Sequence, residues 1–145
     1  MNNHTSSLDS SHYPVMLNEI IKISTPARGG TFIDCTFGGG GYSKKLLTFS
    51  KTIVKGLDRD DKVKKIGNEL EKNFPNRFKF YQKTFSQLDN VTNSLVDVVI
   101  FDLGLSSIQL NDFKRGFSFK SNENLDMSMG LNNISAQDVI NKLSE

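Results

Sequence analysis

The sequence predicts an α/β fold built on a parallel, Rossmann-like sheet. Short β-rich segments alternate with segments of helical composition, and this order favours a parallel sheet with right-handed crossovers. The first β-rich segment, 31–36, runs directly into four glycines at 38–41, and the last, 97–103, reads DVVIFDL. Such an apolar run is typical of a strand covered on both faces. Because ligands bind at the carboxyl ends of parallel strands, we expect the functional residues there.

Four strand–helix units are expected in the chain. The strands are predicted over 31–36, 51–58, 77–85 and 97–103, and the helices over 42–50, 60–73 and 86–95. Residues 106–133, rich in Ser, Asn and Gly, are predicted to be loop-like. Ser135 and Asp138 then open a last helix in the manner of a capping box.

A short helix is expected before the first strand. Residues 14–24 read PVMLNEIIKIS, with Pro14 as the first helical residue and an apolar side made by four residues: Val15, Leu17, Ile20 and Ile21. Residues 1–11 before it are polar and predicted to be a flexible tail.

Length and composition indicate one soluble domain. The chain has 145 residues, 37% of them hydrophobic and 23% charged, which suffices for one modest core. No apolar run approaches the roughly 20 residues of a membrane span. The N-terminus resembles neither a secretory signal nor a mitochondrial presequence, so we expect a cytoplasmic protein. The single cysteine, Cys35, has no Cys or His at ligand spacing, which predicts a metal-free site.

The charge pattern permits a nucleic-acid partner without demanding one. The net charge is only +2, and basic residues cluster at three places: Lys44 with Lys45, Lys62 with Lys64 and Lys65, and Lys114 with Arg115. Each cluster is interpreted as solvated helix surface rather than as a phosphate contact.

The glycine run predicts a nucleotide-like cofactor. Asp34 ends the first strand, and glycines in the loop that follows let a ligand approach the backbone closely. The dinucleotide fingerprint is not met, because Ser43 or Lys44 stands where its third glycine belongs, which disfavours NAD. The Walker pattern is also absent. A tight turn without a ligand is the structural alternative.

Two further residues follow strand ends. Asp58 ends the second strand, where a carboxylate can accept hydrogen bonds from both ribose hydroxyls of an adenosine held by the glycine loop; its alternative role is a helix cap. Phe85 ends the third predicted strand, where an adenine ring would lie, although a Phe there is more often a core residue.

The fourth predicted strand ends in a carboxylate and a flexible turn. Asp102 is followed by a glycine and two serines, Ser106 and Ser107, beside the same strand ends. We interpret Asp102 as the candidate catalytic residue, with capping of the turn as its structural alternative.

Seven motifs, in order and at similar spacing, give the chain a family resemblance. They are HYPVML (12–17), DCTFGGGGYS (34–43), GLDRD (56–60), TFSQL (84–88), DLGLSSIQL (102–110), RGFSF (115–119) and LDM (125–127). With them, the chain resembles the MraW family of small-subunit ribosomal RNA methyltransferases. The resemblance implies a class I methyltransferase core that uses S-adenosylmethionine. It also implies seven cofactor contacts: Gly40, Gly41, Tyr42, Asp58, Phe85, Asp102 and Gln109.

The resemblance further implies the reaction and the partner. The family methylates N4 of a decoding-centre cytosine in 16S ribosomal RNA, so the small ribosomal particle is the expected partner. The amine is a poor nucleophile because its lone pair is delocalised into the ring. An acceptor such as Asp102 could localise that pair while donor and acceptor are held close.

The chain departs from the family in length and at two residues. Tyr42 stands where the family often has His, and Ser128 stands where it has an Arg that helps hold RNA or order the loop. Family members are about twice as long. We therefore expect residues 12–110 to be the cofactor-binding core and 111–145 to be the start of an inserted helical substrate domain, with the sheet incomplete.

An incomplete sheet leaves its apolar fourth strand at an edge, which predicts a homodimer or aggregation. Two alternatives to an active methyltransferase stay open. One is a truncated, non-catalytic cofactor-binding or assembly module, which the length favours. The other is a Rossmann oxidoreductase, which the missing third glycine disfavours.

Overall fold

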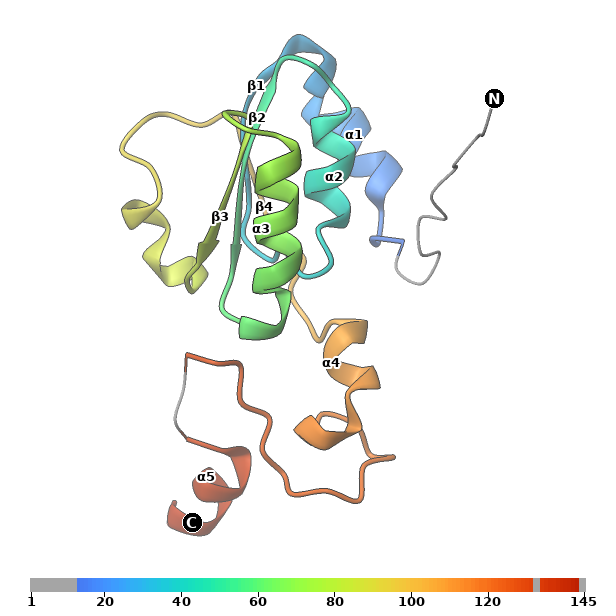
Figure 1. Cartoon of the computed structure of the whole chain (residues 1–145), viewed down its shortest axis with the longest axis vertical. Helices are drawn as coiled ribbons and strands as arrows, with labels where there is room; N and C mark the ends of the chain where they lie inside the picture. The colour runs from blue at the N-terminus through green and yellow to red at the C-terminus, as the bar shows by residue number, and fades with distance from the viewer. Residues whose placement is uncertain (1–12, 132–133, 144–145) are drawn as a thin grey trace.

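The computed structural model describes residues 13–131 and 134–143 (Figure 1). The predicted flexible tail, residues 1–11, lies outside the described residues. No helix in the described ranges is long and apolar enough to cross a membrane.

A parallel sheet of four strands forms the centre of the molecule. The strands are β1 (Gly30–Asp34), β2 (Thr52–Asp58), β3 (Phe78–Gln82) and β4 (Val98–Ile100), in the order β3-β2-β1-β4. Asp34 lies opposite Ile100 of β4, and Asp58 lies opposite Gln82 of β3. The carboxyl ends of the strands therefore meet at one edge of the sheet, and the predicted α/β fold is confirmed.

The α-helices lie on one face of the sheet and beyond its carboxyl edge. Figure 1 shows α1, α2 and α3 beside the sheet, and α4 and α5 past the strand ends. The α-helices are α1 (Leu17–Ser24), α2 (Gly41–Leu47), α3 (Lys64–Asn73), α4 (Ser107–Asn111) and α5 (Ala136–Lys142). Short 3₁₀ helices are η1 (Pro26–Arg28), η2 (Asp61–Val63), η3 (Phe85–Asn90) and η4 (Phe113–Arg115).

The core consists of two clusters, one on each face of the sheet. The larger includes Phe32 of β1 and Leu46 of α2, and the smaller includes Ile33 of β1 and Val91, which follows η3. Adjacent residues of β1 thus enter different clusters, because side chains alternate along a strand. Phe32, Ile33 and Leu46 have no exposed surface, so the burial of each contributes about 1.5–3 kcal/mol.

The first helix begins later than the sequence predicts. Met16 has a left-handed backbone (φ 52°), so α1 starts at Leu17 and not at Pro14. Val15 is mostly exposed, whereas Leu17 is buried in the larger cluster. The apolar side of α1 is therefore narrower than predicted.

The third and fourth strands are shorter than predicted. β4 ends at Ile100, because its neighbour β1 ends at Asp34 directly opposite and offers no further strand residue for pairing. β3 ends at Gln82, so Phe85 opens η3 and does not end the strand. The segment predicted to be loop-like contains α4, whereas the capping box of Ser135 and Asp138 on α5 is confirmed.

Candidate functional site

The glycine loop connects β1 to α2 at the carboxyl edge of the sheet. Gly38 and Gly40 both have left-handed backbones, with φ of 50° and 76°. A Cβ at Gly40 would stand 2.8 Å from the Phe37 ring, so only glycine fits there. A Cβ at Gly39 would meet no atom within 4 Å. The loop is therefore closely packed at Gly40 and open at Gly39.

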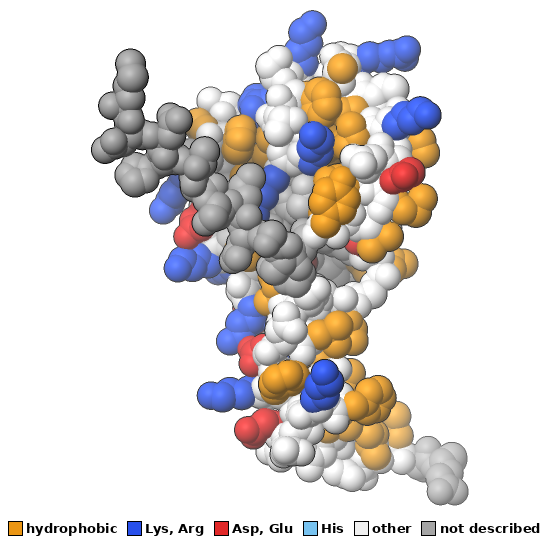
Figure 2. All heavy atoms as spheres, turned by 90° about the vertical axis from the view of Figure 1, so that its right-hand side faces the viewer, with side chains coloured by type: hydrophobic (Ala, Val, Ile, Leu, Met, Phe, Trp, Pro, Cys, Tyr) orange, Lys and Arg blue, Asp and Glu red, His pale blue; other side chains and the backbone are white. Residues whose placement is uncertain are grey.

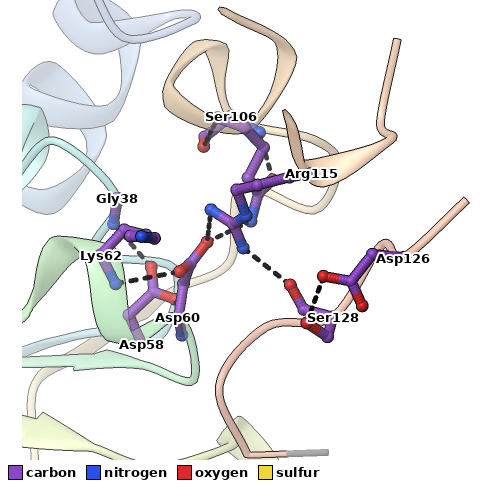
Figure 3. Close-up of polar contacts among 9 residues, drawn as sticks. Gly38, Asp58, Asp60, Lys62, Ser106, Arg115, Asp126 and Ser128 are labelled. Atoms are coloured by element: carbon purple, nitrogen blue, oxygen red, sulfur yellow. Dashed lines mark hydrogen bonds and ion pairs between the residues drawn. The ribbon is translucent and has the colours of Figure 1, made fainter. Parts of the chain in front are cut away.

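Asp58 lies directly beside this loop. The Gly38 N–H donates to Asp58 Oδ2 at 2.8 Å, and the Asp60 N–H donates to Asp58 Oδ1 at 2.9 Å (Figure 3). Burial raises the pKa of Asp58, and these two backbone donors partly oppose the rise. The predicted pairing of the glycine loop with the Asp58 carboxylate is thus present, and each oxygen retains acceptor capacity.

A second carboxylate holds the base of the loop. Asp34 is fully buried and accepts a hydrogen bond from Ser43 Oγ at 2.8 Å, which ties the end of β1 to α2. Burial, together with the charge of Asp58, raises the pKa of Asp34 to about 6. Asp34 therefore supports the loop from beneath.

Asp102 lies beside the same loop, past the end of β4. Its N–H donates to Thr36 Oγ1 at 2.8 Å. The Tyr42 hydroxyl lies 3.3 Å from Asp102 Oδ2 and also donates to the carbonyl oxygen of Val15. Burial and the Asp102 charge raise the pKa of Tyr42 to about 12. The single phenolic proton is shared by two acceptors, so Tyr42 joins the segment before α1 to Asp102.

Phe85 occupies a different position from the loop residues. Its ring meets that of Phe101 edge-on, with centroids 5.7 Å apart. The two residues are 48% and 49% exposed. Phe85 is therefore a half-exposed aromatic beside the end of β4 and is not buried in the core.

Gln109 belongs to a buried polar network. Its Nε2 donates to Asp60 Oδ2 at 3.0 Å, and its Oε1 accepts from the Ser106 N–H at 2.9 Å. Arg115 Nη1 pairs with the same oxygen of Asp60 at 2.8 Å (Figure 3). Burial raises the pKa of Asp60, but hydrogen bonds from Arg115 and Gln109 outweigh it and lower the pKa overall.

Two members of this network were missed by reasoning from the sequence. Arg115 was expected on the solvated surface with Lys114, and this is wrong: Arg115 is only 7% exposed. Asp60 is 1% exposed. Local composition misses this pair, because it does not show which distant charges will meet in the fold. The available signal was the place of the two residues in the GLDRD and RGFSF motifs.

The backbone at Ser128 is held by this network. Arg115 Nη2 donates to the Ser128 carbonyl oxygen at 2.8 Å, and Ser128 Oγ donates to Asp126 at 3.0 Å (Figure 3). The loop at Ser128 is thus ordered by Arg115 and Asp126.

The structure therefore gathers most of the predicted site at one edge of the sheet. Gly40 ends the loop after β1, and Gly41 and Tyr42 open α2 directly after it. Asp58 and Asp102 lie beside them, and Gln109 joins through Asp60. Within residues 13–131 and 134–143, no group of three or more His, Cys, Asp or Glu side chains is placed to hold a metal ion.

Basic side chains do not gather at one place on the face in view. Figure 2 shows Lys and Arg side chains spread over the upper and the lower part of that face, interleaved with hydrophobic side chains on both parts. The lower part contains α5, where Ile140 and Leu143 are 67% and 71% exposed.

Comparison with known proteins gives consistent matches. The model of a family described as "MraW methylase family" matches residues 9–145. Three relatives are named ribosomal RNA small subunit methyltransferase H. The one from Ehrlichia ruminantium (strain Welgevonden) is 40% identical over 140 residues, which cover 92% of this chain and 46% of the relative.

The other two relatives match in a similar way. The protein from Anaplasma marginale (strain Florida) is 44% identical over 81% of this chain and 42% of its own length. The protein from Rickettsia bellii (strain OSU 85-389) is 42% identical over 92% of this chain and 44% of its own length. The chain thus spans about half the length of the relatives it matches.

Proposed function

Because this chain belongs to the MraW methylase family, we propose that it forms the S-adenosylmethionine-binding half of a methyltransferase for small-subunit ribosomal RNA. The observation that carries this proposal is the hydrogen bond between the Gly38 N–H and Asp58 Oδ2 at 2.8 Å. It fixes a carboxylate beside an open glycine loop at the carboxyl ends of parallel strands, where nucleotide ligands bind.

The residues present suit an adenosine-containing cofactor. Both Asp58 oxygens keep acceptor capacity for ribose hydroxyls, and Gly39 leaves space beside the loop. Gly40, Gly41, Tyr42 and Asp102 would form the remaining wall, and Phe85 and Gln109 would approach it from η3 and α4. When bound, S-adenosylmethionine supplies an electrophilic methyl group.

We assign to Asp102 the role of contacting the amine that accepts the methyl group. The proposed acceptor is N4 of a decoding-centre cytosine in 16S ribosomal RNA, as the family resemblance implies. The exposed Asp102 carboxylate would accept the N–H bonds of that amine, and Tyr42 and Thr36 would hold Asp102 in place. The target base must be unpaired or flipped out, because a stacked and paired amine is inaccessible.

A non-catalytic cofactor-binding or assembly module is the second candidate function. The matched residues of this chain correspond to 46% of the first relative's length, and this alternative concerns what these residues do by themselves. Under this alternative the chain binds the cofactor or a ribosomal partner but transfers no methyl group. A cytoplasmic location and a metal-free site stay predictions.

Calorimetric titration of the chain with S-adenosylmethionine tests the proposed function. We expect saturable binding to the wild type, at least a tenfold loss in Asp58→Ala, and no comparable binding of NAD. Asp89→Ala is the matched control, because Asp89 is an exposed carboxylate whose recorded bond is to the neighbouring Asn90 N–H. No binding by folded wild type, or equal binding by Asp58→Ala, would contradict the proposal.

Methylation of small ribosomal particles then separates the two candidates. Transfer of a labelled methyl group to 16S RNA by this chain supports an active enzyme. Cofactor binding without transfer supports the non-catalytic module.

A further inference from the structure

The Asp60–Arg115 pair is the most deeply buried ion pair recorded in the described part of the chain. The side chains of Arg115 and Asp60 are 8% and 2% exposed, and Arg115 Nη1 lies 2.8 Å from Asp60 Oδ2. The other recorded pairs, such as Lys79 with Glu71, are far more exposed. Because a buried charge is costly unless fully paired, such a pair strongly fixes the positions of its two partners.

Three further hydrogen bonds of the pair are recorded besides the ion-pair contact itself. Asp60 Oδ2 accepts from Gln109 Nε2, and Asp60 Oδ1 accepts from the Lys62 N–H at 3.1 Å. Arg115 Nη2 donates to the Ser128 carbonyl oxygen, and the guanidinium lies over the Phe117 ring, 5.1 Å from its centroid. The planar guanidinium therefore joins the end of β2 to the chain around Ser128.

The same network continues to the glycine loop. The Asp60 N–H donates to Asp58 Oδ1, and Asp58 Oδ2 accepts from the Gly38 N–H. Figure 3 shows these contacts running from Gly38 through Asp58 and Asp60 to Arg115 and Ser128. Thus the backbone position of Asp60, which orients Asp58, depends on where its side chain is held.

We propose that Arg115 is a positioning residue for the cofactor site. Through Asp60 it orients the Asp58 carboxylate, and with Gln109 it docks residues 107–128 against the same strand ends. This inference rests on the proposed function, since it assigns to Arg115 an effect on S-adenosylmethionine binding. It requires that cofactor binding and docking of residues 107–128 promote each other, because thermodynamic coupling is reciprocal.

Two substitutions test the proposal without changing the size of a side chain greatly. Arg115→Lys keeps the charge but cannot bridge Asp60 and the Ser128 carbonyl oxygen with a planar group. Asp60→Asn keeps the shape and removes the charge. Arg77→Lys is the matched control, because the partly buried Arg77 donates to carbonyl oxygens of Phe49 and Leu47 at 2.9 Å, away from the glycine loop.

The first measurement is the affinity of each variant of the 145-residue chain for S-adenosylmethionine, with folding checked by circular dichroism. We expect about a tenfold weaker affinity in Arg115→Lys and in Asp60→Asn. The affinity of Arg77→Lys should equal that of the wild type. The double variant Asp60→Asn/Arg115→Lys should bind about as weakly as either single variant, because the two residues act as one unit. Simple addition of the two losses would contradict a shared path.

Amide hydrogen exchange is the second measurement, and a merely structural role would not reproduce its result. Cofactor should slow exchange over residues 107–128 in the wild type and in Arg77→Lys, but not in Arg115→Lys. If the wild type binds the cofactor and Arg115→Lys shows the same affinity and the same protection, this inference is overturned while the proposed function stands. Failure of folded wild type to bind would overturn the proposed function and this inference together.

Discussion

The Tyr42 hydroxyl stands 3.3 Å from Asp102 Oδ2 and donates at the same time to the Val15 carbonyl oxygen. One phenol therefore connects three parts of the chain: the segment before α1, the helix after the glycine loop, and the turn after β4. Tyr42 is 6% exposed, so these contacts form where competition from water is weak.

Tyr42→Phe should destabilise the fold by about 0.5–1.5 kcal/mol, because the hydroxyl of this nearly buried side chain makes hydrogen bonds that Phe cannot replace. Urea unfolding measures this difference. Tyr13→Phe is the matched control, because Tyr13 is 70% exposed and its hydroxyl donates to Asn18 at 3.1 Å; the loss of stability in this variant should be near zero. Equal losses in the two variants would contradict the account of Tyr42.

The raised pKa of Asp34 predicts a pH-dependent stability. Burial raises that pKa from 3.8 to about 6, so between these values the native state binds more protons than the unfolded state. The free energy of unfolding should therefore fall as the pH rises through this window, by about 1.4 kcal/mol per pH unit at most. Asp60 acts in the opposite direction, but only below its ordinary pKa, which lies outside this window.

Urea unfolding of the wild type and of Asp34→Asn at pH 5 and pH 7 checks this prediction. The wild type should gain stability relative to the variant at the lower pH, because the variant has no proton to bind at this position. Ser43→Ala, which removes a bond that lowers the pKa of Asp34, should move the window to higher pH. A difference between wild type and Asp34→Asn that does not change with pH would contradict the assignment.

Close packing of α3 on β3 predicts a large effect at Gly67. A Cβ there would collide with the Phe80 ring, so Gly67→Ala should cost about 1–3 kcal/mol through overpacking, despite the better helix propensity of Ala. The exposed neighbouring residue gives the control, Asn68→Ala, which should be neutral or slightly stabilising. A stable Gly67→Ala variant in thermal unfolding would show that α3 can move away from β3 at little cost.

The open edge at β4 predicts self-association. Val99 and Phe101 are 37% and 49% exposed beside that edge, and an unpaired apolar strand is a template for another chain. Sedimentation at roughly tens of micromolar should show dimers or larger species, and Val99→Lys should reduce them. Ile53→Lys places the same charge on the inner strand β2, where it should have no such effect. A monomer throughout would contradict this prediction.

The parts of the fold that depend on local sequence could be predicted. β1, the glycine loop and the end of β2 follow from short β-rich runs and from glycines that no other residue could replace, as at Gly40. The capping box of α5 follows from Ser135 and Asp138, which are three residues apart. These features are fixed by backbone conformations that the local residues themselves prefer.

The parts that depend on distant contacts could not be predicted. Met16 adopts a left-handed backbone that its residue type does not suggest, and this moves the start of α1. Gln109 and Arg115 both meet Asp60, which for Gln109 is 49 residues away. An Arg beside a Lys looks like surface in a sequence, and only the buried Asp60 carboxylate makes it an interior residue.

The central claim is that S-adenosylmethionine binds at the glycine loop and Asp58, and ¹H–¹⁵N spectra of the chain during titration test it most directly. The account predicts that the largest amide shifts fall on Gly38–Tyr42 and on residues 58–60, with smaller shifts from Ser106 to Gln109. Amide shifts confined to the amino ends of the strands, or no shifts at all in a folded chain, would contradict it.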